Sequence, residues 1–428
     1  MRQGGTVLYE PDRHALLTAI EWDEAAATAA ISRIVDDAEA RFSPATYWPL
    51  HPHDVDPAED PNLIPTPFYF GASGALWALK YLQSVGAVTL RRDPMADLET
   101  LLSRHHAWLR AERSDNHAAY LMGDMPILLM AFGRQPSAAL ADRLAELIEG
   151  QLDHPACELM LGSPGTMLAA LFLHERTADP RWAALFRHTA ARLWAQLEWS
   201  AEHGCHFWTQ EIFGRCFTYL DAVHGFVGTA SPLIRGRHLL DEAAWAGWQQ
   251  TIVNTVTRTA IWEGDQANWR AEMHPPAGGR EKTLMQFCHG APGFVICLAQ
   301  MPGTELDALL LAAGRAVWAA GPLVKGANLC HGTGGNAYAF LKLYRRTQDP
   351  LWLARARAFA MHGIAQTDVA AAQYGQGRYS LWTGDLGFAI FLWDCLQAQA
   401  RFPTLDVFYG APGRSSTPPV DGAGMPSR

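Results

Sequence analysis

The sequence predicts an all-α fold, a double-layered barrel of seven inner and seven outer helices. Two observations predict it: a glycine motif recurs seven times along the chain, and nearly apolar helical segments alternate with amphipathic ones. No stretch shows the sustained alternation of apolar and polar residues that marks a strand. Strands therefore have no place in the predicted architecture.

The repeated motif is a glycine followed three residues later by a second small or turn-forming residue. The copies lie about 40 to 65 residues apart, which is a spacing typical of repeat architectures. In the second copy a proline replaces the last glycine. The seven copies are Gly71-Ala-Ser-Gly74, Gly123-Asp-Met-Pro126, Gly162-Ser-Pro-Gly165, Gly225-Phe-Val-Gly228, Gly290-Ala-Pro-Gly293, Gly332-Thr-Gly-Gly335 and Gly384-Asp-Leu-Gly387.

Each copy precedes a nearly apolar run, such as ALWALKYL or FVICLAQM, that predicts a helix buried on most of its circumference. Residues 179–199 and 349–366, between copies, are amphipathic at helical spacing. Seven inner helices can close into a ring, with their N-termini converging on one end of the barrel. An open helical solenoid, in which the glycines mark loops, is the alternative.

Composition indicates a well-packed globular protein, since 49% of the 428 residues are hydrophobic and 18% are charged. The net charge of −9 and the absence of Lys or Arg runs argue against a nucleic-acid surface. No segment has the length of a membrane span, and the N-terminus lacks the apolar run of a signal peptide. We therefore expect a cytoplasmic protein. Its seven cysteines do not form a disulfide framework.

Three regions are expected along the chain. Residues 1–64 form an N-terminal helix and a lead-in loop, residues 65–408 form the barrel, and residues 409–428, rich in Pro, Gly and Ser, form a disordered tail. The pair His105-His106 lies in an amphipathic helix and is expected at the surface.

Two copies carry Cys-His immediately before their glycine, Cys288-His289-Gly290 and Cys330-His331-Gly332. If the repeats surround one axis, adjacent copies bring these cysteines together. Two thiolates and an imidazole are ligands that Zn²⁺ favours, and three protein ligands leave a fourth position open, as in catalytic sites. The sequence therefore predicts a zinc site at this end of the barrel.

The sequence Cys288-His-Gly-Ala-Pro-Gly-Phe, followed by Leu329-Cys-His-Gly-Thr-Gly-Gly-Asn-Ala-Tyr-Ala-Phe-Leu, resembles the paired zinc signature of lanthionine synthetase C-like proteins. The likeness covers residues 65–408 and implies an α/α toroid. It also implies that the metal ligands are Cys288, Cys330 and His331. His289 stands where family members have other residues, so we leave it outside the coordination shell. Phe287 departs from the tryptophan that is usual before the zinc cysteine.

A third motif copy, Ala222-Val-His224-Gly225, has its histidine at the position of His289 and His331. A histidine at the barrel mouth would lie near the metal and could transfer protons near neutral pH. By resemblance, His224 protonates the enolate that forms when a thiolate adds to a dehydroamino acid. Glu158 matches a position where cyclases hold an acidic residue, and a capping role for it is an equal alternative.

The resemblance implies a zinc-dependent enzyme that adds a thiol to dehydroalanine or dehydrobutyrine in a protein or peptide and makes a thioether. The thiol is either glutathione, which the Ala-Pro-Gly and Asn-Ala-Tyr extensions favour, or a cysteine of the same peptide, as in lanthionine cyclases. Lys325 matches a lysine that holds glutathione in the family, and Arg378 is a second candidate cation. A non-catalytic zinc- or glutathione-binding protein and a sugar-processing α/α barrel without zinc are the alternatives from other classes.

Overall fold

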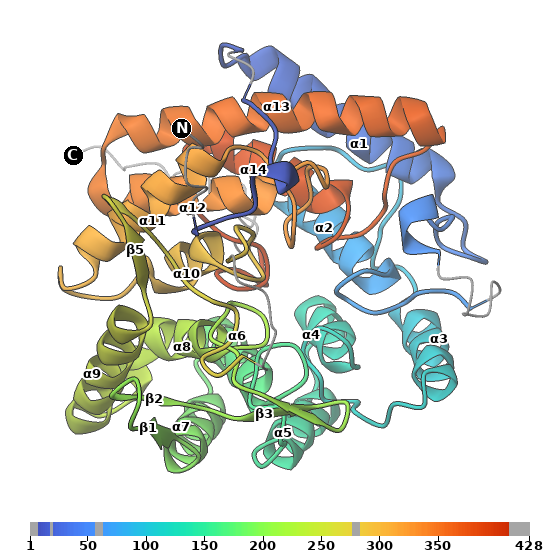
Figure 1. The fold of residues 1–428 in the computed structure, drawn as a ribbon. Helices are drawn as coiled ribbons and strands as arrows, with labels where there is room; N and C mark the ends of the chain where they lie inside the picture. The colour runs from blue at the N-terminus through green and yellow to red at the C-terminus, as the bar shows by residue number, and fades with distance from the viewer. Residues whose placement is uncertain (1–6, 18–19, 56–62, 276–282, 411–428) are drawn as a thin grey trace, which may run out of the picture.

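The computed structural model describes residues 7–17, 20–55, 63–275 and 283–410, and these contain fourteen α-helices in two layers (Figure 1). The inner layer consists of the helix that follows each glycine motif: α2 (Ala72–Ser84), α4 (Met125–Arg134), α6 (Ser163–Thr177), α8 (Phe226–Arg235), α10 (Ala291–Leu298), α12 (Thr333–Thr347) and α14 (Asp385–Gln397). The outer layer consists of α1 (Glu24–Arg41), α3 (Leu98–Ala111), α5 (Ala138–Gly150), α7 (Pro180–Ala195), α9 (Glu242–Arg258), α11 (Asp307–Ala320) and α13 (Pro350–Tyr374).

The inner helices form a closed ring. Each one packs against the next along the chain, and α14 packs against α2 to complete the circle. An open solenoid would leave α2 and α14 apart, so that alternative is wrong and the predicted α/α toroid is confirmed. The seventh outer helix is α1, which packs on α14 and α13 although it lies at the other end of the chain. It comes from residues 1–64, the segment expected to lead into the barrel.

Inner and outer helices begin in different ways. Six outer helices have an Asp or Ser N-cap whose side chain accepts a hydrogen bond from the first turn, as Asp97 does from the Thr100 N–H at 3.0 Å. Most inner helices begin at the motif glycine and bond their first N–H groups to carbonyls of the preceding turn instead. In α12, for example, the Thr333 N–H donates to Gly326 O at 2.8 Å and the Gly335 N–H to Asn328 O at 3.2 Å. This arrangement brings helix and turn too close for a side chain, because a Cβ on Gly335 would collide with the Leu329 carbonyl.

The turns before the inner helices are hydrogen-bonded to one another around the barrel. We call the residue two positions before each motif glycine the junction residue; the seven are Tyr69, Leu121, Met160, Val223, Cys288, Cys330 and Trp382. Backbone hydrogen bonds between neighbouring turns include Trp382 N–H to Tyr69 O (3.2 Å), Tyr69 N–H to Leu121 O (3.1 Å), Leu121 N–H to Met160 O (3.1 Å), Leu159 N–H to Val223 O (3.3 Å), Cys288 N–H to Cys330 O (3.1 Å) and Cys330 N–H to Trp382 O (2.9 Å). We call this set the junction ring. Among the described residues, only the step from Val223 to Cys288 has no such backbone bond.

Three short β-hairpins were missed by the sequence analysis. They pair β1 (Glu198–Ser200) with β2 (Cys205–Phe207), β3 (Gln210–Ile212) with β4 (Arg215–Phe217), and β5 (Ile261–Glu263) with β6 (Gln266–Asn268). Each strand has three residues, which is too short for an alternating pattern to be visible. The tight β3–β4 turn places both Phe213 and Gly214 at positive φ, the geometry that two-residue hairpins favour.

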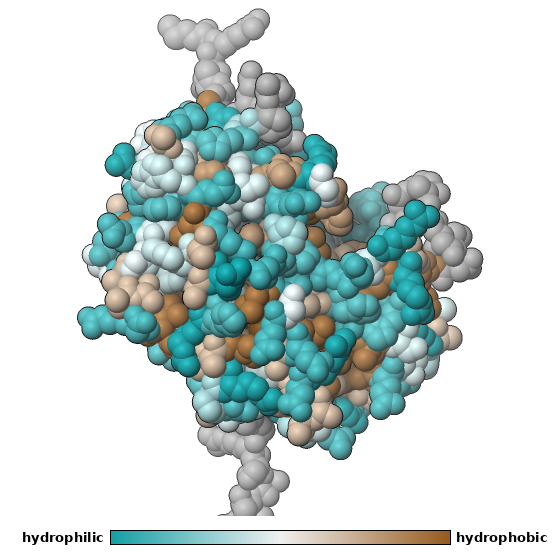
Figure 2. All heavy atoms as spheres, turned by 90° about the horizontal axis from the view of Figure 1, so that it is seen from below, coloured by the Kyte–Doolittle hydropathy of each residue, from teal (hydrophilic) through white to brown (hydrophobic). Residues whose placement is uncertain are grey.

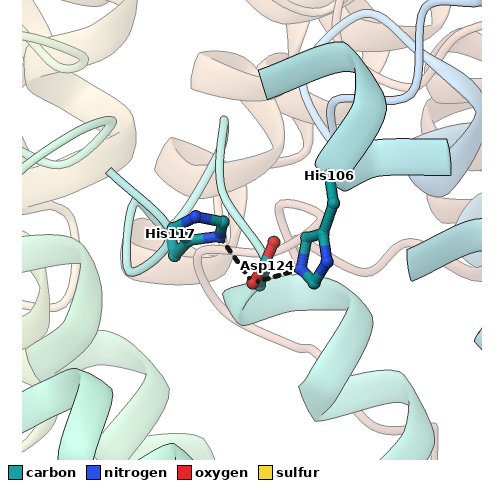
Figure 3. Close-up of side chains that lie close together, drawn as sticks. All are labelled: His106, His117 and Asp124. Atoms are coloured by element: carbon teal, nitrogen blue, oxygen red, sulfur yellow. Dashed lines mark hydrogen bonds and ion pairs between the residues drawn. The ribbon is translucent and has the colours of Figure 1, made fainter. Parts of the chain in front are cut away.

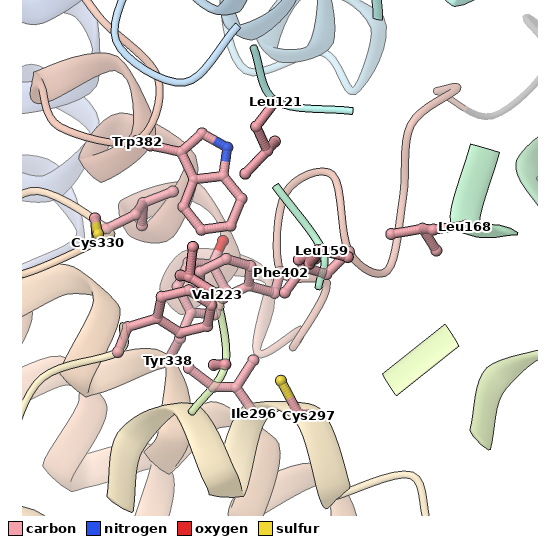
Figure 4. Packing of buried hydrophobic residues seen from close by; sticks show 14 of the residues in the cluster. Leu121, Leu159, Leu168, Val223, Ile296, Cys297, Cys330, Tyr338, Trp382 and Phe402 are labelled. Carbon is pink, nitrogen blue, oxygen red and sulfur yellow. The ribbon is translucent and has the colours of Figure 1, made fainter. Parts of the chain in front are cut away.

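The C-terminal segment fills the middle of the barrel. Phe402 stacks on Phe287 with ring centroids 4.7 Å apart and lies 4.8 Å from the ring of Tyr338. Figure 4 shows Phe402 grouped with Tyr338 and Trp382, with Cys330 at the margin of the cluster. The same segment carries Asp406, which forms a buried ion pair with Lys342 of α12 at 2.6 Å. The barrel therefore has a packed core rather than an open channel.

The described residues contain no helix that is long and apolar enough to cross a membrane. On the face shown in Figure 2, hydrophilic residues predominate and hydrophobic residues lie dispersed between them. Residues 411–428, most of the predicted tail, lie outside the described residues.

We expect Asp406→Ala to lower the free energy of unfolding by about 3–5 kcal/mol, because it leaves the Lys342 ammonium, with a side chain only 3% exposed, without its counter-ion. Urea unfolding followed by circular dichroism measures the effect. The matched control is Glu146→Ala, which removes an exposed partner of Arg143 and should change the stability by less than about 0.5 kcal/mol. Equal effects of the two variants would contradict the assignment.

Candidate functional site

Cys288 and Cys330 are junction residues of adjacent copies and lie side by side before α10 and α12. The Cys288 N–H donates to the Cys330 carbonyl at 3.1 Å, which fixes the two turns against each other. A hydrogen bond between the two thiols, together with burial, raises the pKa of Cys288 well above its usual range. The structure therefore brings together the two cysteines that the sequence analysis predicted as metal ligands.

Two side chains donate hydrogen bonds to these sulfurs. The Tyr69 hydroxyl donates to the Cys330 Sγ at 2.7 Å, and the Gln286 Nε2 donates to the Cys288 Sγ at 2.8 Å. Arg13 orients the amide of Gln286, because its guanidinium donates to Oε1 at 2.8 Å. Donors of this kind stabilise a thiolate and orient it as a metal ligand. Neither Tyr69 nor Gln286 was predicted, and their sequence positions carry no signal for this role.

His331 precedes α12, and its backbone N–H donates to the Asn328 Oδ1 at 3.0 Å. Its imidazole makes no hydrogen bond to any described residue. Burial lowers the pKa of His331 to about 4, and the charges of Lys325 and Arg378 act in the same direction. The ring is therefore neutral at pH 7 and has a lone pair that can bind a metal ion.

The ligand atoms of the three predicted residues, Cys288, Cys330 and His331, lie farther apart than the ligands of one bound metal ion. Within the described part of the chain, two groups of three His, Cys, Asp or Glu residues have ligand atoms within 4.8 Å of one another, and neither group includes Cys288, Cys330 or His331. The two thiols are in contact, so the imidazole of His331 is the ligand that would have to move inward. The donor set fits zinc chemically, since it offers two thiols and one neutral imidazole.

Two carboxylate–histidine pairs face the same region. His224 Nδ1 lies 3.1 Å from Glu158 Oε2, and His289 Nδ1 lies 2.7 Å from Asp221 Oδ2. Both carboxylates are fully buried, whereas the imidazole side chains are 27% and 24% exposed. Each pair thus presents a histidine that is held from behind by a buried anion and is open on its other side.

The same carboxylates also cap the turns that precede the inner helices. Glu158 accepts hydrogen bonds from the N–H groups of Met160 and Leu161, at 2.8 and 2.6 Å. Asp221 accepts from the N–H groups of Val223 and His224, at 3.0 and 2.8 Å. The capping and catalytic interpretations of Glu158 are therefore compatible, because different contacts of one carboxylate serve both.

The pairs keep both histidines protonated. Burial alone would lower the pKa of His224, but the hydrogen bond and the charge of Glu158 outweigh burial and raise the pKa to about 9. For His289, burial is likewise outweighed by Asp221, which raises the pKa to about 9. Both rings are therefore protonated on both nitrogens and positively charged at pH 7, whereas His331 is neutral.

A single repeat position explains this difference. Glu158 and Asp221 each lie four residues before a motif glycine, and each reaches the histidine one residue before the glycine of the next copy. In the copy before His331, that position holds Gln286, which is bonded to Cys288 and Arg13 instead. His331 therefore lacks the neighbouring carboxylate that raises the pKa of the other two histidines. The sequence analysis named His289 but left it outside the metal's coordination shell, and it did not identify Asp221 as its partner.

Lys325 and Arg378, the predicted cations for glutathione, both line a cavity of about 400 Å³ beside the turn that carries Asn328. Lys325 is exposed and makes no ion pair with a described residue. Arg378 is already paired, because its Nε donates to the Asp54 Oδ2 at 2.8 Å and its second nitrogen contacts the other oxygen. The two cations thus share a cavity, but only Lys325 is free to meet an anion.

We expect Glu158→Gln to lower the pKa of His224 from about 9 toward its ordinary value of 6.5. Because the folded-state pKa is raised, this pair stabilises the protein fully below pH 6.5, and the contribution is lost as the pH rises through 9. NMR titration of the His224 ring measures the pKa directly. Urea unfolding at pH 6 and pH 9.5 should show a smaller loss of stability in the variant than in the wild type. The pair Asp221–His289 remains in both proteins as an internal control, and an unchanged His224 pKa would contradict the assignment.

Comparison with known proteins places this geometry in a family. A family model described as lanthionine synthetase C-like protein matches residues 133–407. Glutathione S-transferase LANCL1 of Danio rerio is 34% identical over 203 residues, 44% of this chain and 46% of that protein. LanC-like protein GCL1 of Arabidopsis thaliana is 35% identical over 139 residues, 30% of this chain and 32% of that protein. These matches span less than half the length of either relative.

Among solved structures, nisin cyclase resembles the chain with a TM-score of 0.49 and 13% sequence identity, covering 78% of this chain and 93% of that one. The family model matches well over half of the chain, including five of the seven glycine motifs and both Cys-His-Gly sequences. The chain belongs to the lanthionine synthetase C-like family.

Proposed function

We propose that the protein is a zinc-dependent enzyme that adds a thiol, by preference glutathione, to dehydroalanine or dehydrobutyrine residues of a protein or peptide. The observation that carries this proposal is the position of the protonated His224–Glu158 pair and the paired thiols of Cys288 and Cys330 in the same series of turns. Membership of the lanthionine synthetase C-like family supports the reaction class.

Cys288, Cys330 and His331 would hold the zinc ion. Cysteine sulfur and neutral histidine nitrogen are ordinary zinc ligands, and three of them leave a fourth position for a substrate thiol. When bound, zinc lowers the pKa of such a thiol, so that a thiolate is present at neutral pH. Tyr69 and Gln286 would orient the two cysteine sulfurs through the hydrogen bonds that they already donate.

The reaction has two proton transfers. The thiol loses its proton to a base, and an acid later delivers a proton to the α-carbon. The thiolate sulfur forms a bond to the β-carbon of the dehydroamino acid, the carbon–carbon double bond becomes single, and a proton is added to the α-carbon. His224 would donate that proton from Nε2, since Nδ1 is held by Glu158. No electron donor or acceptor is consumed.

Glu158 acts on His224 as a positioning residue in this proposal. It holds the ring by one nitrogen and keeps it protonated, so that the opposite nitrogen faces the substrate with a proton to give. His289 and Asp221 repeat the same arrangement one copy further along, and the open N–H of the protonated His289 ring would stabilise the enolate as it forms.

Glutathione is the favoured thiol because one of the relatives is named a glutathione S-transferase and because Lys325 is a free cation at the rim of a cavity near His331. Glutathione carries two carboxylates that a cation can bind. A cysteine of the same peptide, which would make the protein a lanthionine-forming cyclase, is the second candidate. A non-catalytic zinc- or glutathione-binding protein is the third.

The central test uses a dehydroalanine peptide that contains no cysteine, incubated with glutathione and followed by mass spectrometry. We expect the wild type to bind zinc and to add one glutathione, and His224→Ala to retain zinc while the rate falls by about 100-fold or more. His238→Ala, which removes an exposed histidine, is the control and should behave as the wild type. Zinc without an adduct would favour the cyclase or the binding protein, and a protein that binds no zinc would overturn the proposal.

The role of Lys325 is tested by kinetics. Lys325→Ala removes a cation that would bind a carboxylate of glutathione, so we expect KM for glutathione to rise about tenfold while kcat changes little. Lys80→Ala, at another exposed lysine, is the matched control. If glutathione is the substrate but KM is the same in both variants, Lys325 has no part in binding it.

A further inference from the structure

Three histidines surround one buried carboxylate on the opposite part of the ring from the two cysteines. His106 Nε2 and His117 Nδ1 each lie 2.9 Å from the Asp124 Oδ2. Figure 3 shows the two imidazoles pointing at Asp124 from two sides, one from helix α3 and one from the loop that follows it. The ligand atoms of this trio all lie within 4.8 Å of one another. His105, the neighbour of His106, approaches the other carboxylate oxygen at 3.8 Å.

We propose that His106, His117 and Asp124 form a second metal site, which binds a divalent first-row transition-metal ion such as Zn²⁺ or Co²⁺. The proposal does not rest on the proposed function, and none of its residues belongs to the site at Cys288, Cys330 and His331. It rests on the trio's geometry, on unsatisfied buried atoms and on the absence of a capping role for Asp124.

Asp124 stands at the N-cap position of α4, where an aspartate normally accepts hydrogen bonds from the first turn. Its side chain makes no such bond and points toward the histidines instead. The carboxylate is buried, with a side chain only 4% exposed. It is therefore shielded from water, makes no bond to the helix N-terminus, and faces three imidazoles. Helix capping therefore does not explain why an aspartate stands here.

Two buried polar atoms in this cluster have no hydrogen-bond partner: Asp124 Oδ1 and His105 Nε2. His105 is completely buried, and its other nitrogen, Nδ1, lies 3.0 Å from the Thr66 hydroxyl. Its Nε2 faces the Asp124 Oδ1 across 3.8 Å, which is longer than a hydrogen bond. A cation that bound both carboxylate oxygens would satisfy Asp124 Oδ1 as well. The expectation that the pair His105-His106 lies at the surface is wrong for His105, which packs inward against Trp108.

The donor set selects the class of ion. Two imidazoles and one carboxylate suit Zn²⁺, Co²⁺, Ni²⁺ or Fe²⁺, whereas Ca²⁺ and Mg²⁺ prefer oxygen ligands throughout. With metal–ligand bonds of about 2.0–2.2 Å, ligands of one ion lie about 2.9–3.5 Å apart, so the 2.9 Å contacts already have nearly the required spacing.

To bind the ion, each ring would present an unprotonated nitrogen and its lone pair toward Asp124, with its N–H on the other ring nitrogen. His106 and His117 are 37% and 39% exposed, so the remaining coordination positions are open to water or to an added ligand. The ion would join α3, the loop after it and the start of α4. That loop includes Leu121, whose backbone belongs to the junction ring.

The test measures metal stoichiometry and cobalt spectra of the full chain after removal of metal by a chelator. Zn²⁺ is added in equilibrium dialysis and counted by mass spectrometry, and Co²⁺ is followed by absorbance. A cobalt ion at the cysteine site gives a thiolate charge-transfer band, whereas an ion held only by nitrogen and oxygen gives none. The second site is therefore distinguishable in the wild type even if the first site binds nothing.

We expect His117→Ala and Asp124→Asn each to lower the stoichiometry by one ion and to leave any thiolate band unchanged. His203→Ala is the matched control, because it removes one histidine from the cluster of Glu202, His203 and His274. The carboxylate of that cluster, Glu202, is 76% exposed, whereas Asp124 is buried. Circular dichroism verifies that each variant is folded, and His106→Ala replaces any variant that is not. If wild type and folded His117→Ala bind the same number of ions, the second site does not exist.

Discussion

Backbone hydrogen bonds between the turns that precede the inner helices are the interaction on which the rest of this structure depends. They join the junction residues of neighbouring copies and hold the N-terminal ends of the inner helices at fixed spacing. The motif glycines make this possible, because a Cβ at Gly335 or Gly293 would meet the carbonyl of the preceding turn. Since most copies present equivalent positions to their neighbours, residues that are distant in the sequence lie side by side. Cys288 and Cys330, 42 residues apart, are in contact for this reason.

The one step of the ring without a backbone bond among the described residues is bridged by side chains. Between the turns of Val223 and Cys288, the buried Asp221 reaches His289 at 2.7 Å, and the Glu158–His224 pair lies one step before it. Each carboxylate here has two roles, since it caps its own turn and stabilises the protonated form of the histidine of the next copy. Replacement of the carboxylate by Gln286 at the following step leaves His331 neutral. The residue at this one repeat position thus determines the charge of three equivalent histidines. His224 and His289 are protonated, and the neutral His331 is a potential metal ligand.

Much of the fold could be predicted from the sequence, because the glycine motif and the apolar runs mark every inner helix locally. The role of α1 could not, because it packs on α14 from the opposite end of the chain and no local pattern encodes that contact. In the candidate site, the motif spacing identified Cys288, Cys330, His331 and His224 as residues that share one end of the barrel. Tyr69, Gln286 and Asp221 were missed, since their roles depend on which neighbour a side chain reaches across the junction ring. His105 was assigned to the surface because helical periodicity shows which residues share a face but not what covers that face.

The glycine motif that departs most from the pattern, Gly123-Asp-Met-Pro126, is also the one beside which an unexplained polar cluster lies. In other copies the residue after the first glycine is Ala, Ser, Phe or Thr, or the Asp385 that accepts from the Arg378 backbone at 2.8 Å. Asp124 accepts no backbone N–H from its own turn; its side chain contacts His106 of α3 and the imidazole of His117, which lies seven residues before it, as Arg378 does before Asp385. A buried carboxylate that accepts no hydrogen bond from a nearby backbone N–H must be stabilised by other charges or dipoles. The imidazoles do this incompletely, because Asp124 Oδ1 and His105 Nε2 have no hydrogen-bond partner, and a bound cation would add positive charge beside the carboxylate. The proposed ion at His106, His117 and Asp124 would supply that charge on the opposite part of the ring from Cys288 and Cys330.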